Sequence, residues 1–100
     1  MYLASISSLP KGKAVVVSTP SGKRVVVLNT ADGIRAFSTI CPHLGCQVHW
    51  EDENNHFFCP CHSAVFDPTG KAMEGPPASD GKDMLAVEIA LEGDGVFAWV

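Results

Sequence analysis

Two short segments hold the residues of this chain that could bind a metal. The first box reads Cys41-Pro42-His43-Leu44-Gly45-Cys46, and the second reads Cys59-Pro60-Cys61-His62. Fifteen residues separate His43 from Cys59, so the boxes can meet only through folding. All four cysteines of the chain lie in these boxes, whereas a disulfide-rich secreted domain would spread its cysteines along the chain. The clustering therefore indicates a metal site.

Thiolates and imidazoles together suit iron–sulfur chemistry. A 2Fe–2S cluster takes four protein ligands, two on each iron, and thiolates bind ferric iron because they are charged, polarisable donors. When two neutral imidazoles replace two thiolates, the cluster is less electron-rich and its reduction potential rises. A formally neutral cluster also accepts an electron at lower electrostatic cost in a low-dielectric pocket than a doubly negative one. A mixed ligand set thus predicts a one-electron carrier.

Zinc is the main alternative metal for such residues. Structural zinc sites use four ligands and favour cysteine pairs separated by two to four residues. Four residues separate Cys41 from Cys46, but only one separates Cys59 from Cys61, and the six candidate ligands exceed four. A domain with two plain disulfides would leave the box histidines without a role. We therefore favour the iron–sulfur interpretation over a structural zinc module and over a disulfide scaffold.

The two boxes resemble those of the Rieske iron–sulfur family in its high-potential, disulfide-containing form. The family pattern is Cys-x-His-x-x-Cys followed by Cys-x-Cys-His, and both boxes match it. The resemblance is strong over residues 41–67, and Gly75-Pro76-Pro77 resembles the family's proline loop, which covers the cluster. It implies one 2Fe–2S cluster per chain. Carried over residue by residue, it implies Cys41 and Cys59 as ligands of one iron, His43 and His62 as ligands of the other, and a disulfide between Cys46 and Cys61.

The chain departs from the family directly after the second box. The family commonly reads Gly-Ser-x-Tyr-Asp where this chain has Ser63-Ala64-Val65-Phe66-Asp67. In high-potential members the serine and tyrosine hydroxyls donate hydrogen bonds to the cluster and ligand sulfurs. Ala64 and Phe66 supply no hydroxyl, so we expect a potential below those members yet above all-thiolate ferredoxins. Ser63 carries a hydroxyl one position earlier, which leaves a contact between Ser63 and a sulfur open.

Short apolar runs separated by turn residues surround the boxes, and the histidines outside the boxes belong to this framework. No segment has a helical period with caps. We therefore expect an all-β domain of short antiparallel strands in stacked small sheets. The whole chain, 1–100, is expected to be a single Rieske domain, with the cluster-binding region, about 39–82, inserted in the β framework. His49 and His56 are interpreted as strand residues, and Trp50 and Trp99 as core aromatics. The expected strands are 14–17, 24–28 and 34–37, a hairpin of 48–50 with 56–58, and a closing hairpin of 84–90 with 96–100.

Size and charge exclude several classes of function. The chain has 100 residues, which suits one domain, and its net charge of −4 with seven scattered Lys and Arg residues argues against a nucleic-acid binder. No apolar run approaches the length of a membrane span, and no secretory signal is visible. We therefore expect the chain as given to be soluble, with any membrane anchor absent from it.

The resemblance implies a redox subunit that has no complete active site of its own. The disulfide form is typical of quinol-oxidising cytochrome bc-type complexes, where the cluster takes an electron from quinol and passes it to a cytochrome c-type haem beside cytochrome b. His62, with His43 as second choice, is the expected quinol contact and proton acceptor, and a disulfide implies the periplasm or the outer face of an energy-transducing membrane.

Other Rieske carriers are the alternatives. A subunit of arsenite oxidase can keep the second cysteine pair, whereas an oxygenase ferredoxin usually lacks it. A terminal oxygenase is excluded because no room remains for a mononuclear iron domain.

Overall fold

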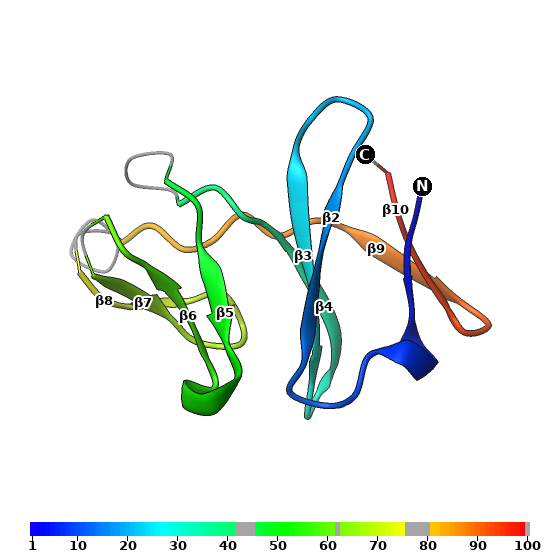
Figure 1. The fold of residues 1–100 in the computed structure, drawn as a ribbon, viewed down its shortest axis with the longest axis horizontal. Helices are drawn as coiled ribbons and strands as arrows, with labels where there is room; N and C mark the ends of the chain where they lie inside the picture. The colour runs from blue at the N-terminus through cyan, green and yellow to red at the C-terminus, as the bar shows by residue number, and fades with distance from the viewer. Residues whose placement is uncertain (42–45, 62, 76–80, 100) are drawn as a thin grey trace. The chain divides into compact units, whose positions relative to one another are not determined.

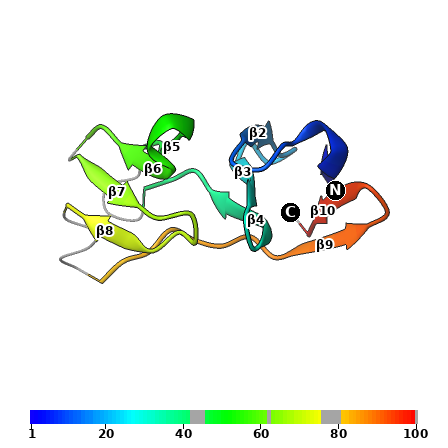
Figure 2. The same ribbon diagram turned by 90° about the horizontal axis from the view of Figure 1, so that it is seen from below.

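The described residues form short antiparallel strands. The computed structural model describes residues 1–41, 46–61, 63–75 and 81–99, and in this part of the chain the strands make three small sheets (Figures 1 and 2). This confirms the predicted all-β class. The chain divides into two compact units: Met1–Ser38 with Ala86–Val100, and Thr39–Leu85.

The first unit holds two three-stranded antiparallel sheets around a shared apolar core. One sheet has the order β1-β10-β9 and the other β2-β3-β4. Val27 of β3 and Val96 of β10 are fully buried in a cluster with Leu3 and Ala36. The strands are β1 (Tyr2–Ser5), β2 (Ala14–Ser18), β3 (Arg24–Thr30), β4 (Gly33–Ser38), β9 (Ile89–Glu92) and β10 (Gly95–Ala98), and a 3-10 turn, η1 (Ile6–Ser8), follows β1.

The second unit is one four-stranded antiparallel sheet of order β5-β6-β7-β8. Its β5–β6 hairpin pairs His49 with Phe58 and Glu51 with His56. Trp50 and Phe57 therefore lie on the opposite face of the sheet from His49 and Glu51, where their rings pack edge to face with centroids 4.9 Å apart. The elements are β5 (His49–Glu51), a 3-10 turn η2 (Asp52–Asn54), β6 (His56–Cys59), β7 (Ala64–Phe66) and β8 (Ala72–Glu74).

The predicted β2, β3, β4 and β5–β6 segments agree with the observed strands, but the closing hairpin begins later than predicted. Its first strand starts at Ile89, not at Met84, because the Met84 amide donates to the carbonyl of Gly70 at 2.8 Å, and Ala86 makes only an isolated bridge to Phe37. The interpretation of Trp99 as a core aromatic was wrong, since its side chain is 75% exposed.

Candidate metal centre

The second box begins on the buried face of the four-stranded sheet. Cys59 ends β6 and lies directly opposite Ala64 of β7, while Phe57 lies opposite Phe66. Since residues two apart in a strand share a face, these four side chains lie on one face, and each is at most 1% exposed. The β6–β7 pairing therefore holds the Cys59 thiol in an apolar surrounding.

The first box is a loop that is closed at its base by hydrogen bonds. The amide of Cys41 donates to the carbonyl of Cys46, the amide of Val48 donates to the carbonyl of Thr39 at 2.7 Å, and Ile40 and Gln47 form an antiparallel bridge. The Cys41 side chain is 4% exposed. The chain thus carries a second buried thiol on a loop with a fixed base.

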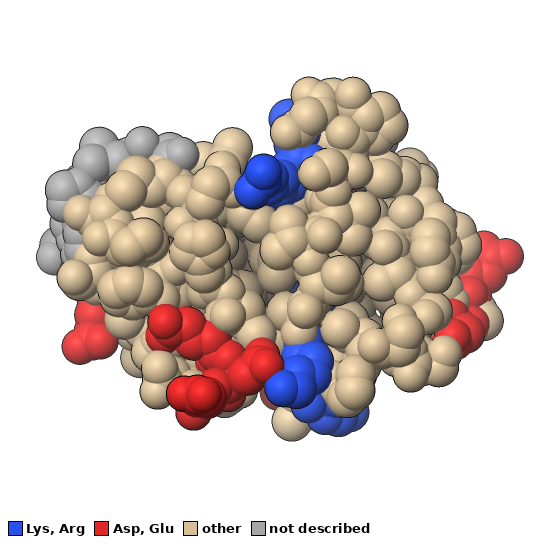
Figure 3. All heavy atoms as spheres, viewed as in Figure 1, with Lys and Arg blue, Asp and Glu red and all other residues tan. Residues whose placement is uncertain are grey.

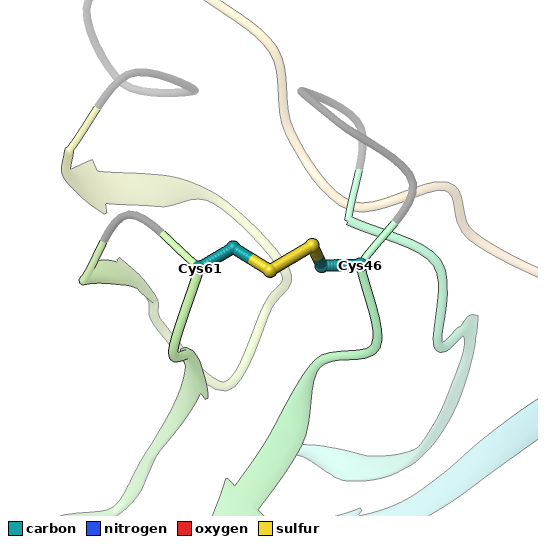
Figure 4. The surroundings of a disulfide bond; sticks show 2 residues. All are labelled: Cys46 and Cys61. Atoms are coloured by element: carbon teal, nitrogen blue, oxygen red, sulfur yellow. A yellow bond between two sulfur atoms is a disulfide. The ribbon is translucent and has the colours of Figure 1, made fainter.

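A disulfide joins the two boxes. Cys46 and Cys61 are bonded, with their Cα atoms 6.5 Å apart and a sequence separation of 15 (Figure 4). This is the pairing that the family resemblance implied. A cross-link over a loop of this length stabilises a folded domain by about 3 kcal/mol. The sulfurs of Cys46, Cys59 and Cys61 all lie within 4.8 Å of one another, so the disulfide sits beside the Cys59 thiol.

Two of the four predicted ligands can be placed. Because Cys46 and Cys61 are bonded to each other, Cys41 and Cys59 are the cysteines outside the disulfide, and both are buried. His43 and His62 lie outside the described residues, as do Leu44, Pro76 and Pro77. The donor set fits a Rieske cluster in its cysteine half, since it offers two buried thiols on two loops that the disulfide ties together.

The turn after the second box explains why Ala64, and not Ser63, lies beside Cys59. Ser63 adopts a left-handed backbone conformation with φ of 53° and is exposed, whereas Ala64 begins β7 and is buried. A positive φ is unusual for a residue with a side chain, and glycine is the usual residue there. Ser63 stands where the family commonly has glycine, the residue that adopts this conformation most readily.

Gly75 lies against this turn, in a contact that sequence reasoning missed. A Cβ atom on Gly75 would stand 2.9 Å from Cα of Ala64 and 3.3 Å from its nitrogen, and Gly75 itself has φ of +88°. Both observations require glycine at this position. The chain after β8 therefore approaches the residue that lies opposite Cys59, which the sequence could not show because ten residues separate positions 64 and 75.

The remaining histidines lie on the β5–β6 hairpin, outside both boxes. His56 Nε2 lies 2.8 Å from Oε1 of Glu51, which also accepts a hydrogen bond from Asn54 at 3.0 Å. The Asn54 amide, and after it the imidazole of His56, lower the pKa of the Glu51 carboxyl. His49 is exposed on the same strand face as Glu51. His49 and His56 therefore lie in β5 and β6, as expected for strand residues.

A second carboxylate orders the turn between β7 and β8. Partial burial raises the pKa of Asp67, but hydrogen bonds from the hydroxyl and amide of Thr69 and from the amide of Lys71 outweigh burial and leave the pKa below its usual value. The amide of Gly70 also donates to the carbonyl of Asp67 at 2.8 Å. Residues 67–70 therefore form a hydrogen-bonded turn.

Comparison with known proteins identifies the family. Residues 1–89 match the model of the Rieske [2Fe-2S] domain. The chain belongs to the Rieske family. Its cofactor is therefore a Rieske-type 2Fe–2S cluster, for which the boxes supply cysteines and histidines of the required types.

Relatives of this Rieske chain include iron-sulfur subunits of cytochrome b6-f complexes. It is 38% identical over 96 residues to the cytochrome b6-f complex iron-sulfur subunit of Chlorobaculum thiosulfatiphilum. The aligned residues cover 96% of this chain and 51% of that protein. The crystal structure of the plasma membrane Rieske protein PetC3 from Synechocystis PCC 6803 superposes with a TM-score of 0.72 at 32% identity, covering 87% of this chain and 86% of that one.

The fold alone is shared more widely. The ferredoxin of carbazole 1,9a-dioxygenase from Nocardioides aromaticivorans IC177 has a TM-score of 0.71 at 20% identity, over 98% of this chain and 94% of that one. The Rieske chain spans about half the length of the cytochrome b6-f subunits that it matches. Within its described residues, no helix has the length and apolar character that crossing a membrane requires.

Proposed function

We propose that Cys41 and Cys59 ligate one iron of the cluster and that His43 and His62 ligate the other. The observation that carries this assignment is the Cys46–Cys61 disulfide, because it removes two of the four cysteines from consideration and leaves two buried thiols. The matching spacing of both boxes supports the histidine half.

The ligand assignment predicts which histidines the cluster needs. His43→Gln and His62→Gln should each yield protein without the Rieske visible spectrum. His49→Gln and His56→Gln are matched controls, because those residues lie on the hairpin, and both should keep the cluster. Retention of the spectrum in His43→Gln or in His62→Gln would contradict the assignment, as would loss of the spectrum in both controls.

We further propose that the domain transfers single electrons within a quinol-oxidising, cytochrome bc-type complex. When bound, the cluster supplies the one-electron chemistry. His62, and after it His43, would accept the quinol proton at the ring nitrogen that does not bind iron. Cys41 and Cys59 would hold the other iron in an apolar surrounding, away from water. The cytochrome b6-f relatives and the disulfide support this function, and the latter favours an oxidising compartment such as the periplasmic side of a membrane.

The charge of the cluster-bearing unit supports a basic partner. Residues Thr39–Leu85 include seven acidic and two basic residues, a net formal charge of −5, whereas the other unit has a net charge of +1. Acidic side chains gather at the η2 end of the four-stranded unit (Figure 3). A negative surface of this kind attracts a positively charged protein over several ångströms, in a manner that salt weakens.

Purification of the full-length protein from its native membranes tests the function. A tagged protein should copurify with b-type and c-type haems, and quinol should reduce the c-type haem. If the protein instead copurifies with a molybdenum enzyme and arsenite reduces the cluster, then the arsenite oxidase alternative is correct and the quinol proposal fails.

A further inference from the structure

At the base of the first box, Thr39 and Gln47 make a contact that depends on their side chains. The hydroxyl of Thr39 donates a hydrogen bond to Oε1 of Gln47 at 2.5 Å. It stands beside the two main-chain bonds that close the same loop, from the amide of Val48 to Thr39 and from the amide of Cys41 to Cys46. The main-chain bonds form whatever the side chains are, but the third bond requires a hydroxyl donor at position 39 and an acceptor at position 47.

Burial makes the Thr39 hydroxyl dependent on this partner. The Thr39 side chain is 2% exposed, so water cannot readily replace Gln47 as its acceptor, while Gln47 is itself exposed. A buried hydroxyl that loses its acceptor keeps the desolvation cost without compensation. The pair therefore favours the closed loop, because opening at this point separates Thr39 from Gln47.

The disulfide and this contact constrain the first box in different ways. The disulfide ties the first box to the second, whereas the Thr39–Gln47 contact closes the first box on itself. Cys46 is half-buried and Cys61 is exposed, so a small dithiol can attack the disulfide at Cys61. The attack forms a mixed disulfide, and the second thiol of the reagent then displaces Cys61, which leaves two cysteine thiols and one oxidised, cyclic reagent molecule.

We propose that Thr39 and Gln47 form a latch, meaning this one side-chain hydrogen bond, that keeps Cys41 in place independently of the Cys46–Cys61 disulfide. While the disulfide is intact, both devices hold the loop. Once the disulfide is reduced, the latch adds to the main-chain contacts at the base of the loop. Thr39 is thus a positioning residue that acts through Cys41, and the inference rests on the proposed role of Cys41 as a cluster ligand.

The test measures the rate at which the holoprotein loses its cluster to an iron chelator, monitored by visible circular dichroism. The rate is measured with the disulfide intact and after dithiothreitol has reduced the disulfide. With the disulfide intact, Thr39→Val should lose the cluster at nearly the wild-type rate. With the disulfide reduced, it should lose the cluster about fivefold faster than reduced wild type, as expected for one lost hydrogen bond. Thr39→Ser restores a donor and should return the rate to that of wild type.

Variants at the partner residue make the test independent of the buried position. Gln47→Leu removes the acceptor at an exposed site and should behave like Thr39→Val, whereas Gln47→Glu keeps the acceptor and should behave like wild type. Thr30→Val is the matched control, because the Thr30 hydroxyl donates to the carbonyl of Gly33 at 2.7 Å in the other unit. It should leave the rate of cluster loss unchanged under both conditions.

Two outcomes separate the latch from the ligand assignment on which it rests. Equal rates for reduced wild type, Thr39→Val and Gln47→Leu would overturn the latch, and so would a failure of Thr39→Ser to restore the rate. A Cys41→Ser variant that keeps the cluster spectrum of wild type would instead overturn the ligand assignment. If Thr39→Val does not fold, Gln47→Leu alone decides the matter.

Discussion

Restoring the two missing hydroxyls beside Cys59 should raise the reduction potential of the cluster. The substitutions are Ala64→Ser and Phe66→Tyr, made together. Ala64 lies directly opposite Cys59 across the β6–β7 pair, and Phe66 shares its face two residues on. Both are fully or almost fully buried, whereas Ser63 is exposed in a left-handed turn. The structure therefore places position 64, and not Ser63, next to the sulfur of Cys59, the proposed ligand.

The magnitude follows from the sheet geometry and from the energy of a hydrogen bond. Directly opposite residues in an antiparallel pair have Cβ atoms about 4.5–5.5 Å apart, so a hydroxyl on residue 64 comes within hydrogen-bond reach of a sulfur on Cys59. A hydrogen bond to sulfur stabilises the reduced state more than the oxidised state. If each bond contributes about 1 kcal/mol, a one-electron potential rises by roughly 40 mV per bond and by roughly 80 mV for both.

Protein-film voltammetry of the holoprotein measures this shift, and thermal unfolding supplies a second observable. The double variant should have the raised potential and an intact fold, and each single variant should give about half of the rise. Ser63→Ala is the control and should leave the potential unchanged, since that side chain is exposed. An unchanged or lower potential in the double variant would show that these hydroxyls do not donate to a sulfur of the cluster site. A loss of stability in Phe66→Tyr without a rise in potential would show a buried hydroxyl that finds no acceptor, which costs about 1–3 kcal/mol.

Three further predictions concern backbone strain and titration. Ser63→Gly should raise the free energy of unfolding by about 1 kcal/mol in urea titration, because glycine adopts φ of 53° without strain. Asn55→Gly, at a similar φ of 52°, should change the free energy of unfolding little, since asparagine tolerates this conformation. Equal effects of the two substitutions would contradict backbone strain at Ser63. The potential should fall at alkaline pH, because the oxidised cluster acidifies its ligand imidazoles, and a potential that stays flat to strongly alkaline pH would contradict ligation by His43 and His62. The pKa of Glu51 is lowered in the folded state, so its contribution to stability should be present above the ordinary carboxyl pKa and be lost as pH falls through the lowered value. Glu51→Gln should remove that part of the pH dependence of the free energy of unfolding. If stability falls with acid in the variant as it does in wild type, this role of Glu51 is wrong.

The sequence predicted the parts of the fold in which local pattern and tertiary contacts agree. The Val-rich runs of β2 and β3 are strands because both their propensity and their pairing favour extended backbone. Three-residue strands such as β7 and β8 have too few residues for an alternating pattern, and they form because β6 provides the first pairing edge. The run from Met84 looks like a strand locally, but its first amide is bound to Gly70 instead of to a neighbouring strand.

The candidate site was predictable where chemistry requires fixed residue types at fixed spacing. The disulfide between Cys46 and Cys61 followed from the family resemblance, because both boxes match the family pattern. The approach of Gly75 to Ala64 and the Thr39–Gln47 contact were not predictable, since each depends on the distance between backbone segments that only folding brings together. Such contacts leave no periodic signal in a single sequence.

Pulsed electron paramagnetic resonance of the reduced holoprotein, with ¹⁵N-labelled histidine, shows whether two imidazoles bind the cluster. We expect nitrogen couplings from two imidazoles bound to the cluster, those of His43 and His62, and the same pair of couplings in a His49→Gln, His56→Gln double variant. A cluster with no directly bound nitrogen, or a protein that contains zinc and gives no cluster signal, would contradict it.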